Sequence, residues 1–157
     1  MSMAYLWLLP RFSGFSEQFP DIPVNILATV NEADYQKPNV DLALLYGNGD
    51  WPGYEATLLF PEAIFPVCSP AFLEQHPDIK TTGSFLQKQL LNLRIERWDW
   101  VDWHQWLVAK DIPIPNDIRI MGFNSLPLLI KAACQGQGVG LGWETLVNRY
   151  LEEGTLL

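Results

Sequence analysis

Apolar residues recur along the chain at two spacings, one typical of helices and one typical of strands. Phe12, Phe15 and Phe19 fall on one helical face, and Pro10 indicates that this helix either begins there or is kinked there. Further helices are expected from Ser69-Pro70, from Ser84, over 98–110, from Leu126 to Gly136 and from Leu146 to Gly154. Strands are expected over 24–30, 39–46, 55–60, 63–68, 90–95, 117–121 and 139–142.

The predicted strands and helices alternate over almost the whole chain. Such alternation is typical of an α/β fold with a largely parallel sheet. It restarts after the apolar run 65–68, which indicates a crossover between two lobes at that point. The sequence contains no internal repeat and no low-complexity tract, so a repeat architecture is excluded.

Composition narrows the class of protein. The chain has 157 residues, with 10 Lys and Arg against 18 Asp and Glu, and a formal charge of −8. This acidic balance argues against nucleic-acid binding by the chain itself, because phosphate groups require clustered Lys and Arg. No apolar run approaches the roughly 20 residues that span a bilayer, and no signal peptide is visible. We therefore expect a soluble, cytoplasmic, globular protein without a disulfide framework.

The residues that could carry chemistry form no catalytic or metal-binding pattern. The glycine-rich run 136–142 does not fit a dinucleotide-binding motif, so we interpret it as a helix end that leads into a tightly packed strand. Cys68, Cys134, His76 and His104 lack the spacing of metal ligands. Neither G-x-S-x-G nor S-x-x-K occurs. The sequence therefore predicts no catalytic residue, no bound metal and no cofactor.

Polar residues at two predicted helix starts are better functional candidates. Ser2 precedes the first helix, and Asn124-Ser125 precede the helix that begins at Leu126. Free backbone N–H groups and the helix dipole attract carboxylates at such places. Helix capping alone explains the same residues, so both interpretations stay open.

Four tryptophans lie close together at positions 98, 100, 103 and 106. Trp103 and Trp106 share a helical face, which predicts that both lie in the core. Trp98 and Trp100 precede that face and are candidates to line a cleft. Core packing is the favoured interpretation for the set as a whole.

Short motifs follow one another along nearly the whole chain. They are WLLPRF (7–12), FPDI (19–22), VDLAL (40–44), GNGDWPG (47–53), LFPE (59–62), FPVCSPAFL (65–73) and the segment 129–141, which contains AACQGQGVGL. In this order and spacing the chain resembles the effector-binding domain of LysR-type transcriptional regulators. The 47–53 loop and the block 66–70 are most similar to the subgroup that includes regulators of glycine-cleavage operons.

The resemblance implies two α/β lobes of the type 2 periplasmic-binding-protein kind, with a small effector in the cleft between them. It assigns residues 1–66 to a first lobe that lacks its first strand, 67–153 to a second lobe, and 154–157 to the start of a crossover back. The effector contacts that it implies are Ser2, Thr29, Tyr46, Gly47, Pro66, Ser69, Asn124 and Ser125, to which Trp98 is added as a cleft wall.

The resemblance also implies partners and a mechanism. Effector binding shifts domain and oligomer geometry, and thereby changes how a separate helix-turn-helix domain, absent from this chain, binds DNA. An incomplete first lobe would expose sheet edges, which predicts self-association or segment exchange. The alternatives are a stand-alone solute-binding protein of the same fold, an interaction module with an empty cleft, and an enzyme, which would need a reactive side chain that the sequence does not show.

Overall fold

The structure is a computed structural model that describes residues 2–29, 39–79, 83–95 and 100–157. The chain divides into two compact units, unit 1 (Met1–Glu62) and unit 2 (Ala63–Leu157). The division falls at Glu62, shortly before the boundary that the sequence places at residue 66. The assignment of these units to the two lobes of the family stays a prediction.

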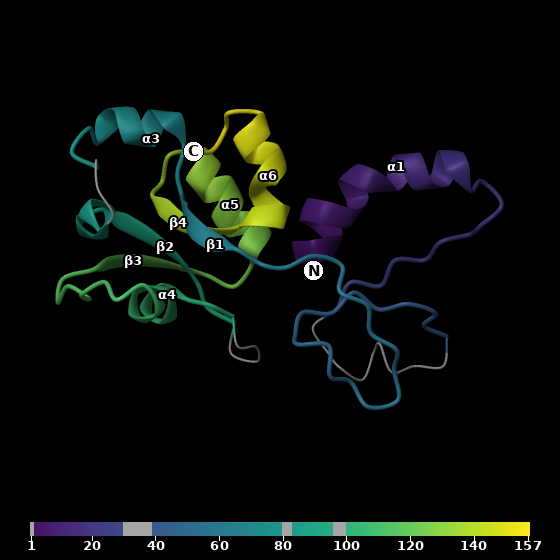
Figure 1. Cartoon of the computed structure of the whole chain (residues 1–157). Coiled ribbons are helices and arrows are strands. Elements are labelled where there is room, and N and C mark those ends of the chain that lie inside the picture. Colours follow the sequence, from purple (N-terminus) through teal and green to yellow (C-terminus); the bar gives the residue numbers. More distant parts are fainter. Residues whose placement is uncertain (1, 30–38, 80–82, 96–99) are drawn as a thin grey trace. The chain divides into compact units, whose positions relative to one another are not determined.

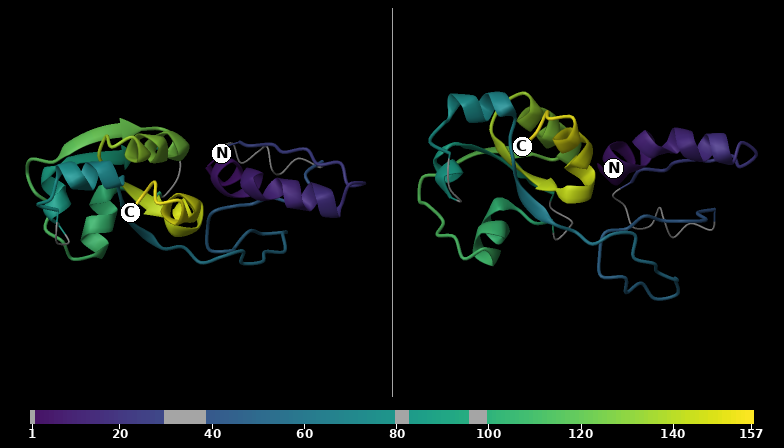
Figure 2. Two further views of the ribbon diagram at one scale, coloured as in Figure 1. Left: turned by 90° about the horizontal axis from the view of Figure 1, so that it is seen from above. Right: turned by 45° about the horizontal axis from the view of Figure 1, so that its top comes forward.

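The described part of unit 1 begins with a continuous helix (Figures 1 and 2), whose type changes at Leu9, the residue before Pro10. A π-helical part, η1 (Ala4–Leu8), runs directly into α1 (Leu9–Gln18). Proline has no N–H to donate to the preceding turn, and the wider π-helical turns lie immediately before it. The structure therefore selects the longer of the two predicted helices. Phe19 ends α1, and its ring packs against Phe15 at a centroid distance of 5.1 Å.

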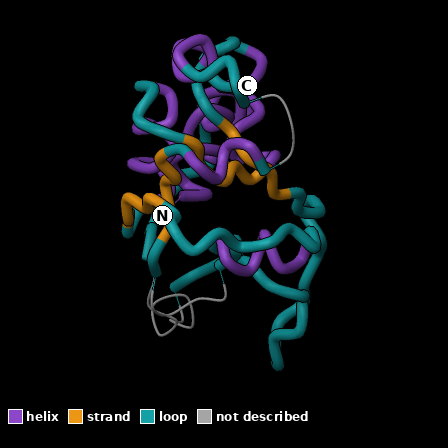
Figure 3. Tube along the Cα trace, turned by 90° about the vertical axis from the view of Figure 1, so that its left-hand side faces the viewer, coloured by secondary structure: helices purple, strands orange, loops and turns teal. Residues whose placement is uncertain are grey.

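The described residues of unit 1 that follow α1 form neither helix nor strand (Figure 3). The predicted strands over 24–30, 39–46 and 55–60 are therefore wrong wherever the structure describes them. Leu27, Leu42 and Leu58 are 61%, 76% and 78% exposed. A strand needs a paired backbone and a covered apolar face, and the described residues of unit 1 supply neither.

Unit 2 is built on a sheet of four strands within the described residues, in the order β1-β4-β2-β3. β2 (Gln89–Leu93), β3 (Arg119–Phe123) and β4 (Val139–Trp143) are parallel, while β1 (Ile64–Val67) is antiparallel to β4. All five residues of β4 are buried, as its uninterrupted apolar run predicts. The predicted α/β fold with a largely parallel sheet is confirmed in this unit.

Helices cover both faces of the sheet in unit 2 (Figure 1). α5 (Leu126–Cys134) and α6 (Glu144–Glu152) lie on one face, and α4 (Trp103–Ala109) lies on the other. Close approach on the first face depends on glycine, because a Cβ at Gly140 would come within 2.6 Å of Leu129 Cδ2. The apolar core of unit 2 thus lies in two layers, above and below the sheet.

The two short helices early in unit 2 begin differently. α3 (Pro70–Gln75) is capped as predicted, because the Phe72 N–H donates a hydrogen bond of 3.2 Å to Ser69 Oγ. The helix expected from Ser84 is present, but its N-cap is the preceding residue, Gly83. The segment Ser84–Gln87 is a 3-10 helix, η2, and its cap is Gly83 at φ 100°, a conformation that glycine adopts without strain.

A capping box forms the start of α4. Asp102 Oδ1 accepts a hydrogen bond of 2.8 Å from the Gln105 N–H, and Gln105 Oε1 accepts one of 3.0 Å from the Asp102 N–H. Asp102 and Gln105 are three residues apart, which is the spacing that this motif requires. The helix consequently starts at Trp103, later than the helix predicted over 98–110.

The glycine-rich run 136–142 connects α5 to β4. Gly136 has φ 73°, which ends the helix in the left-handed conformation. A Cβ at Gly138 would collide with the carbonyl oxygen of Gln89 on the neighbouring strand. The interpretation of this run as a helix end and a tightly packed strand is confirmed.

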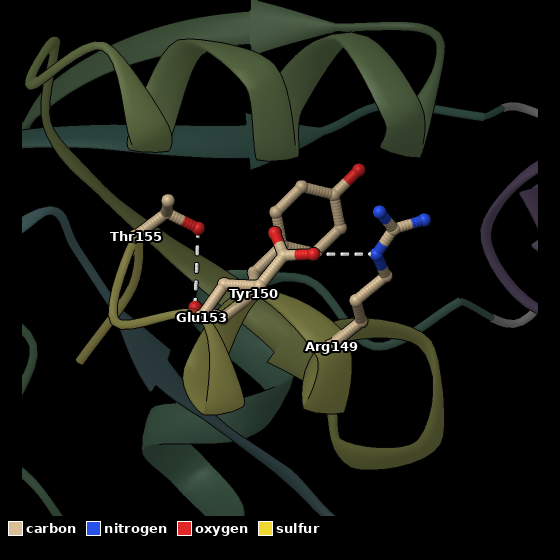
Figure 4. Close-up of polar contacts among 4 residues, drawn as sticks. All are labelled: Arg149, Tyr150, Glu153 and Thr155. Carbon is tan, nitrogen blue, oxygen red and sulfur yellow. Dashed lines mark hydrogen bonds and ion pairs between the residues drawn. The ribbon is translucent and has the colours of Figure 1, made fainter.

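The last residues of the chain fold onto unit 2. Thr155 Oγ1 donates a hydrogen bond of 3.1 Å to the Tyr150 carbonyl oxygen at the end of α6 (Figure 4). The following residue, Leu156, is completely buried. Leu157 and Cys68 exchange two backbone hydrogen bonds, of 2.9 and 3.2 Å. The described structure thus holds this segment beside the residue that follows β1.

Candidate functional site

The carboxyl ends of three parallel strands meet at one edge of the sheet in unit 2. β2 ends at Leu93, β3 ends at Phe123 and β4 ends at Trp143. In open α/β sheets, ligands bind outside the carboxyl ends of the strands, where loops and helix N-termini converge. This edge, called the carboxyl edge below, is therefore a candidate ligand-binding site.

A pocket of about 360 Å³ lies at the carboxyl edge, where β2 ends. Its lining combines apolar side chains with groups of both charges: Leu93, Arg94, Ile95, Trp100, Asp102, His104 and Gln105. The volume is at the lower end of the range found for small-molecule sites. The pocket can therefore offer a small ligand both apolar contact and charge-assisted hydrogen bonds.

Arg94 is the first residue after β2. Its backbone N–H donates a hydrogen bond of 2.7 Å to the Phe123 carbonyl oxygen, which holds the two strands together at the carboxyl edge. Its side chain lies over Gly122 of β3, since a Cβ there would be 3.3 Å from Arg94 Cδ and 3.4 Å from Nε. Glycine thus leaves room for the arginine stem. The guanidinium is exposed and joins no ion pair among the described residues.

Asn124 is the first residue after β3, as Arg94 is the first after β2. The paired residues Leu93 and Phe123 end the register of these two strands. Ser125 follows as the N-cap of α5, with an extended backbone and no side-chain capping hydrogen bond. The predicted pair Asn124-Ser125 therefore lies at the carboxyl edge.

Two of the four clustered tryptophans belong to the core, as predicted. Trp103 is 2% exposed, and its indole N–H donates a hydrogen bond of 2.9 Å to the Leu91 carbonyl oxygen. Trp106 is 6% exposed and donates one of 2.9 Å to the Ile64 carbonyl oxygen. These two bonds tie α4 to β2 and to β1, so the wall of the pocket next to α4 is rigidly supported.

Trp100 lines the pocket and packs edge-on against Trp143, with ring centroids 5.4 Å apart and an interplanar angle of 71°. Trp143 is buried, and its indole N–H has no hydrogen-bond partner in the part of the chain that the structure describes. The other candidate for a cleft wall, Trp98, lies outside the described residues. Trp100 is thus the tryptophan that the structure places at the pocket.

The predicted contacts Pro66 and Ser69 lie elsewhere in unit 2. Pro66 is in β1, opposite Leu141 of β4. Ser69 is 2% exposed, and its hydroxyl oxygen would be 3.3 Å from a Cβ at Gly136, which precedes β4. Ser69 therefore lies at the opposite edge of the sheet from Asn124 and serves as the cap of α3. The structure does not bring these two residues together with Arg94.

The remaining predicted contacts belong to unit 1. Ser2 lies in the first turn of the helix, and Thr29 is the last described residue before position 39. The Tyr46 hydroxyl forms a hydrogen bond with the Glu62 carboxyl group, whose pKa is raised by partial burial and lowered in part by this bond. Gly47 has φ 154°, and a Cβ there would be 2.9 Å from the Trp51 ring. Their role as effector contacts stays a prediction.

Arg94 is not among the site residues that the sequence predicts. A signal for it existed, because this is a charged residue placed directly after an uninterrupted buried run, Leu90–Leu93. A charge at the end of a buried parallel strand lies at the edge where α/β folds bind ligands. Periodicity within the run identifies the strand, but only the folded structure shows that Arg94 lies at the pocket beside α4.

Other reactive groups form no site among the described residues. Cys68 and Cys134 are free, and burial raises the pKa of both thiols, which keeps them protonated near neutral pH. The described residues contain no group of three or more His, Cys, Asp or Glu side chains that could hold a metal ion. They also contain no helix that is long and apolar enough to cross a membrane.

Comparison with known families gives a match over the full chain. The profile described as "LysR substrate binding domain" matches residues 1–157. The chain belongs to this LysR family. The "Glycine cleavage system transcriptional activator" of Escherichia coli (strain K12) is 33% identical over 156 residues, 99% of this chain and 50% of the relative. The "HTH-type transcriptional regulator DsdC" of the same strain is 29% identical over 164 residues.

Solved structures of the LysR family agree with this fold. The AmpR effector binding domain from Citrobacter freundii has a TM-score of 0.76 at 27% identity, and covers 99% of this chain and 76% of its own. The effector domain of AmpR of Pseudomonas aeruginosa has a TM-score of 0.74 at 29% identity. The predicted resemblance and the type 2 periplasmic-binding-protein-like fold are confirmed. The chain spans about half the length of the curated relatives that it matches.

Proposed function

We propose that this chain is the effector-sensing part of a LysR-type transcriptional regulator that acts in the cytoplasm. A small effector, an amino acid or another small carboxylate, binds without being chemically changed, so the role is not enzymatic. The observation that carries the proposal is the carboxyl edge of unit 2. There a pocket of ligand size contains a guanidinium that joins no ion pair among the described residues, in a chain of an effector-binding family.

The effector acts by shifting a conformational equilibrium. A ligand that binds one arrangement of the protein more tightly increases the population of that arrangement. The affected partners are a second copy of the chain and DNA, the latter through a helix-turn-helix domain outside this chain. Curated relatives named as transcriptional regulators support this role over that of a stand-alone solute-binding protein.

Thermal unfolding of the chain with a panel of amino acids and small carboxylates tests the proposal. A compound at ten times its Kd stabilises the folded state by about 1.4 kcal/mol, because it binds that state alone. For a chain of this size, the expected rise in Tm is about 3–6 °C. A panel without any saturable rise would contradict effector sensing by this chain. For a confirmed ligand, Ser125→Ala should weaken the affinity, and an unchanged Kd would remove Ser125 from the site.

A further inference from the structure

The charged group of Arg94 takes no part in an ion pair among the described residues of unit 2. Its backbone N–H completes the contact between β2 and β3, and its stem lies over Gly122. The guanidinium has no acidic partner among the described residues and stays exposed at the pocket. The strand ladder needs only the backbone of this residue, so the side chain is free to serve a ligand.

We propose that Arg94 binds the anionic group of the effector, and that the pocket takes a small carboxylate whose apolar part lies against Trp100. This inference rests on the proposed function and names the residue that holds the anionic group of the effector. A guanidinium presents parallel N–H donors that match the two oxygens of a carboxylate, which makes it the preferred side chain for planar anion recognition.

The rest of the lining sets the orientation of such a ligand. Leu93, Ile95 and Trp100 provide apolar surface, and Trp100 is held in place by its edge-on contact with Trp143. Asp102 is fixed by the capping box of α4 and presents a negative charge to the same pocket. An anion is repelled by Asp102 and attracted by Arg94, so the carboxylate points to the end of β2.

A matched pair of probes tests the anion contact directly. Phenylacetate has a carboxylate and an aromatic ring, and phenylacetamide keeps the ring and shape without the charge. We expect phenylacetate to bind with a Kd of about 1 mM. Phenylacetamide should bind about tenfold more weakly, because a hydrogen bond to a charged group contributes about a factor of ten in affinity. Titrations followed by the side-chain Nε–H signals of arginine in ¹H–¹⁵N NMR report both the affinity and the residue involved.

Three variants separate the role of Arg94 from a general loss of charge. Arg94→Gln should lower the affinity for phenylacetate about tenfold and remove the preference over the amide. Arg94→Lys keeps the charge without the two-pronged geometry and should fall between wild type and Arg94→Gln. Arg119→Gln is the matched control, because Arg119 is exposed at the start of β3, outside the pocket lining. It should bind phenylacetate as wild type does.

Several outcomes would overturn the inference. They are equal binding of acid and amide, an unchanged Kd in Arg94→Gln, an equal loss in Arg119→Gln, or no saturable binding of phenylacetate up to about 20 mM, roughly twenty times the expected Kd. An unchanged Tm in Arg94→Gln shows that the fold is retained, as expected for an exposed side chain. If the phenylacetate tests fail but another compound of the panel stabilises the chain, the proposed function is retained and the role of Arg94 is not. If no compound of the panel stabilises the chain, both the proposed function and the role of Arg94 are contradicted.

Discussion

Units 1 and 2 contain similar stretches of apolar sequence. These stretches are buried in unit 2 and largely exposed in the described part of unit 1. In unit 2, Leu90, Leu91 and Ile130 have no exposed surface, and helices cover both faces of the sheet. In unit 1, the described segments after α1 leave Leu42 and Leu58 more than three-quarters exposed. An apolar run is stabilising only where other strands pair with it and helices cover it. The intrinsic stability and the candidate site of this chain therefore belong to unit 2.

Removing one buried side chain from each unit gives the largest expected difference. Leu129→Ala deletes a side chain that is 1% exposed, packed over Gly140, and should lower the free energy of unfolding by about 3 kcal/mol. The matched change Leu42→Ala removes a side chain that is 76% exposed and should change it by less than about 0.5 kcal/mol. Urea unfolding measures both. Similar losses in the two variants would show that unit 1 is as well packed as unit 2.

Adding one methyl group should act with opposite sign in the two units. Gly138→Ala forces a Cβ against the Gln89 carbonyl oxygen and should destabilise the chain by about 2 kcal/mol. Gly14→Ala, within α1, meets nothing within 4 Å and should stabilise it by about 0.7 kcal/mol, since alanine loses less conformational freedom in a helix. Circular dichroism melts of both variants against wild type make the comparison. A stable Gly138→Ala protein would contradict the close packing of β4 against β2.

Removal of the N-cap of α4 should have the next largest effect on the free energy of unfolding. Asp102→Ala deletes the acceptor of the Gln105 N–H and should lower the free energy of unfolding by about 1 kcal/mol. Asp102→Asn keeps an acceptor oxygen at the same place and should cost only a few tenths of that. Chemical denaturation of the pair resolves this difference. Equal losses would mean that the charge of Asp102 matters more than its capping bond.

Sequence reasoning succeeded where local pattern and tertiary structure agree. The run Val139–Trp143 is buried at every position and the helix from Leu126 ends at a left-handed glycine, so both elements were predictable. The strands over 24–30, 39–46 and 55–60 failed, because apolar spacing records a preference for extended structure but not the presence of a pairing partner. Asn124-Ser125 was found as a helix start. Arg94 was not predicted, because its place at the pocket depends on the packing of α4 against the end of β2.

The pH dependence of stability provides the smallest expected effect and the most specific probe of unit 1. Partial burial raises the pKa of Glu62 above its ordinary value, and the hydrogen bond from Tyr46 opposes part of that shift. The folded state therefore holds the proton more tightly than the unfolded state, so stability falls as pH rises from the unfolded pKa through the folded pKa. Glu62→Gln has no proton to lose, and should match wild type near pH 4 and exceed its stability at pH 7.

Tyr46→Phe removes the opposing hydrogen bond. It should move the falling part of the wild-type curve to higher pH, because nothing then offsets the burial of the carboxyl group. Urea midpoints measured between about pH 4 and pH 7 test both variants, with Glu17→Gln on exposed α1 as the control for a general loss of one negative charge. Parallel curves for Glu62→Gln and wild type would mean that Glu62 is as well solvated in the folded chain as in the unfolded one. In that case the contact between Tyr46 and Glu62 would not withdraw the carboxyl group from solvent.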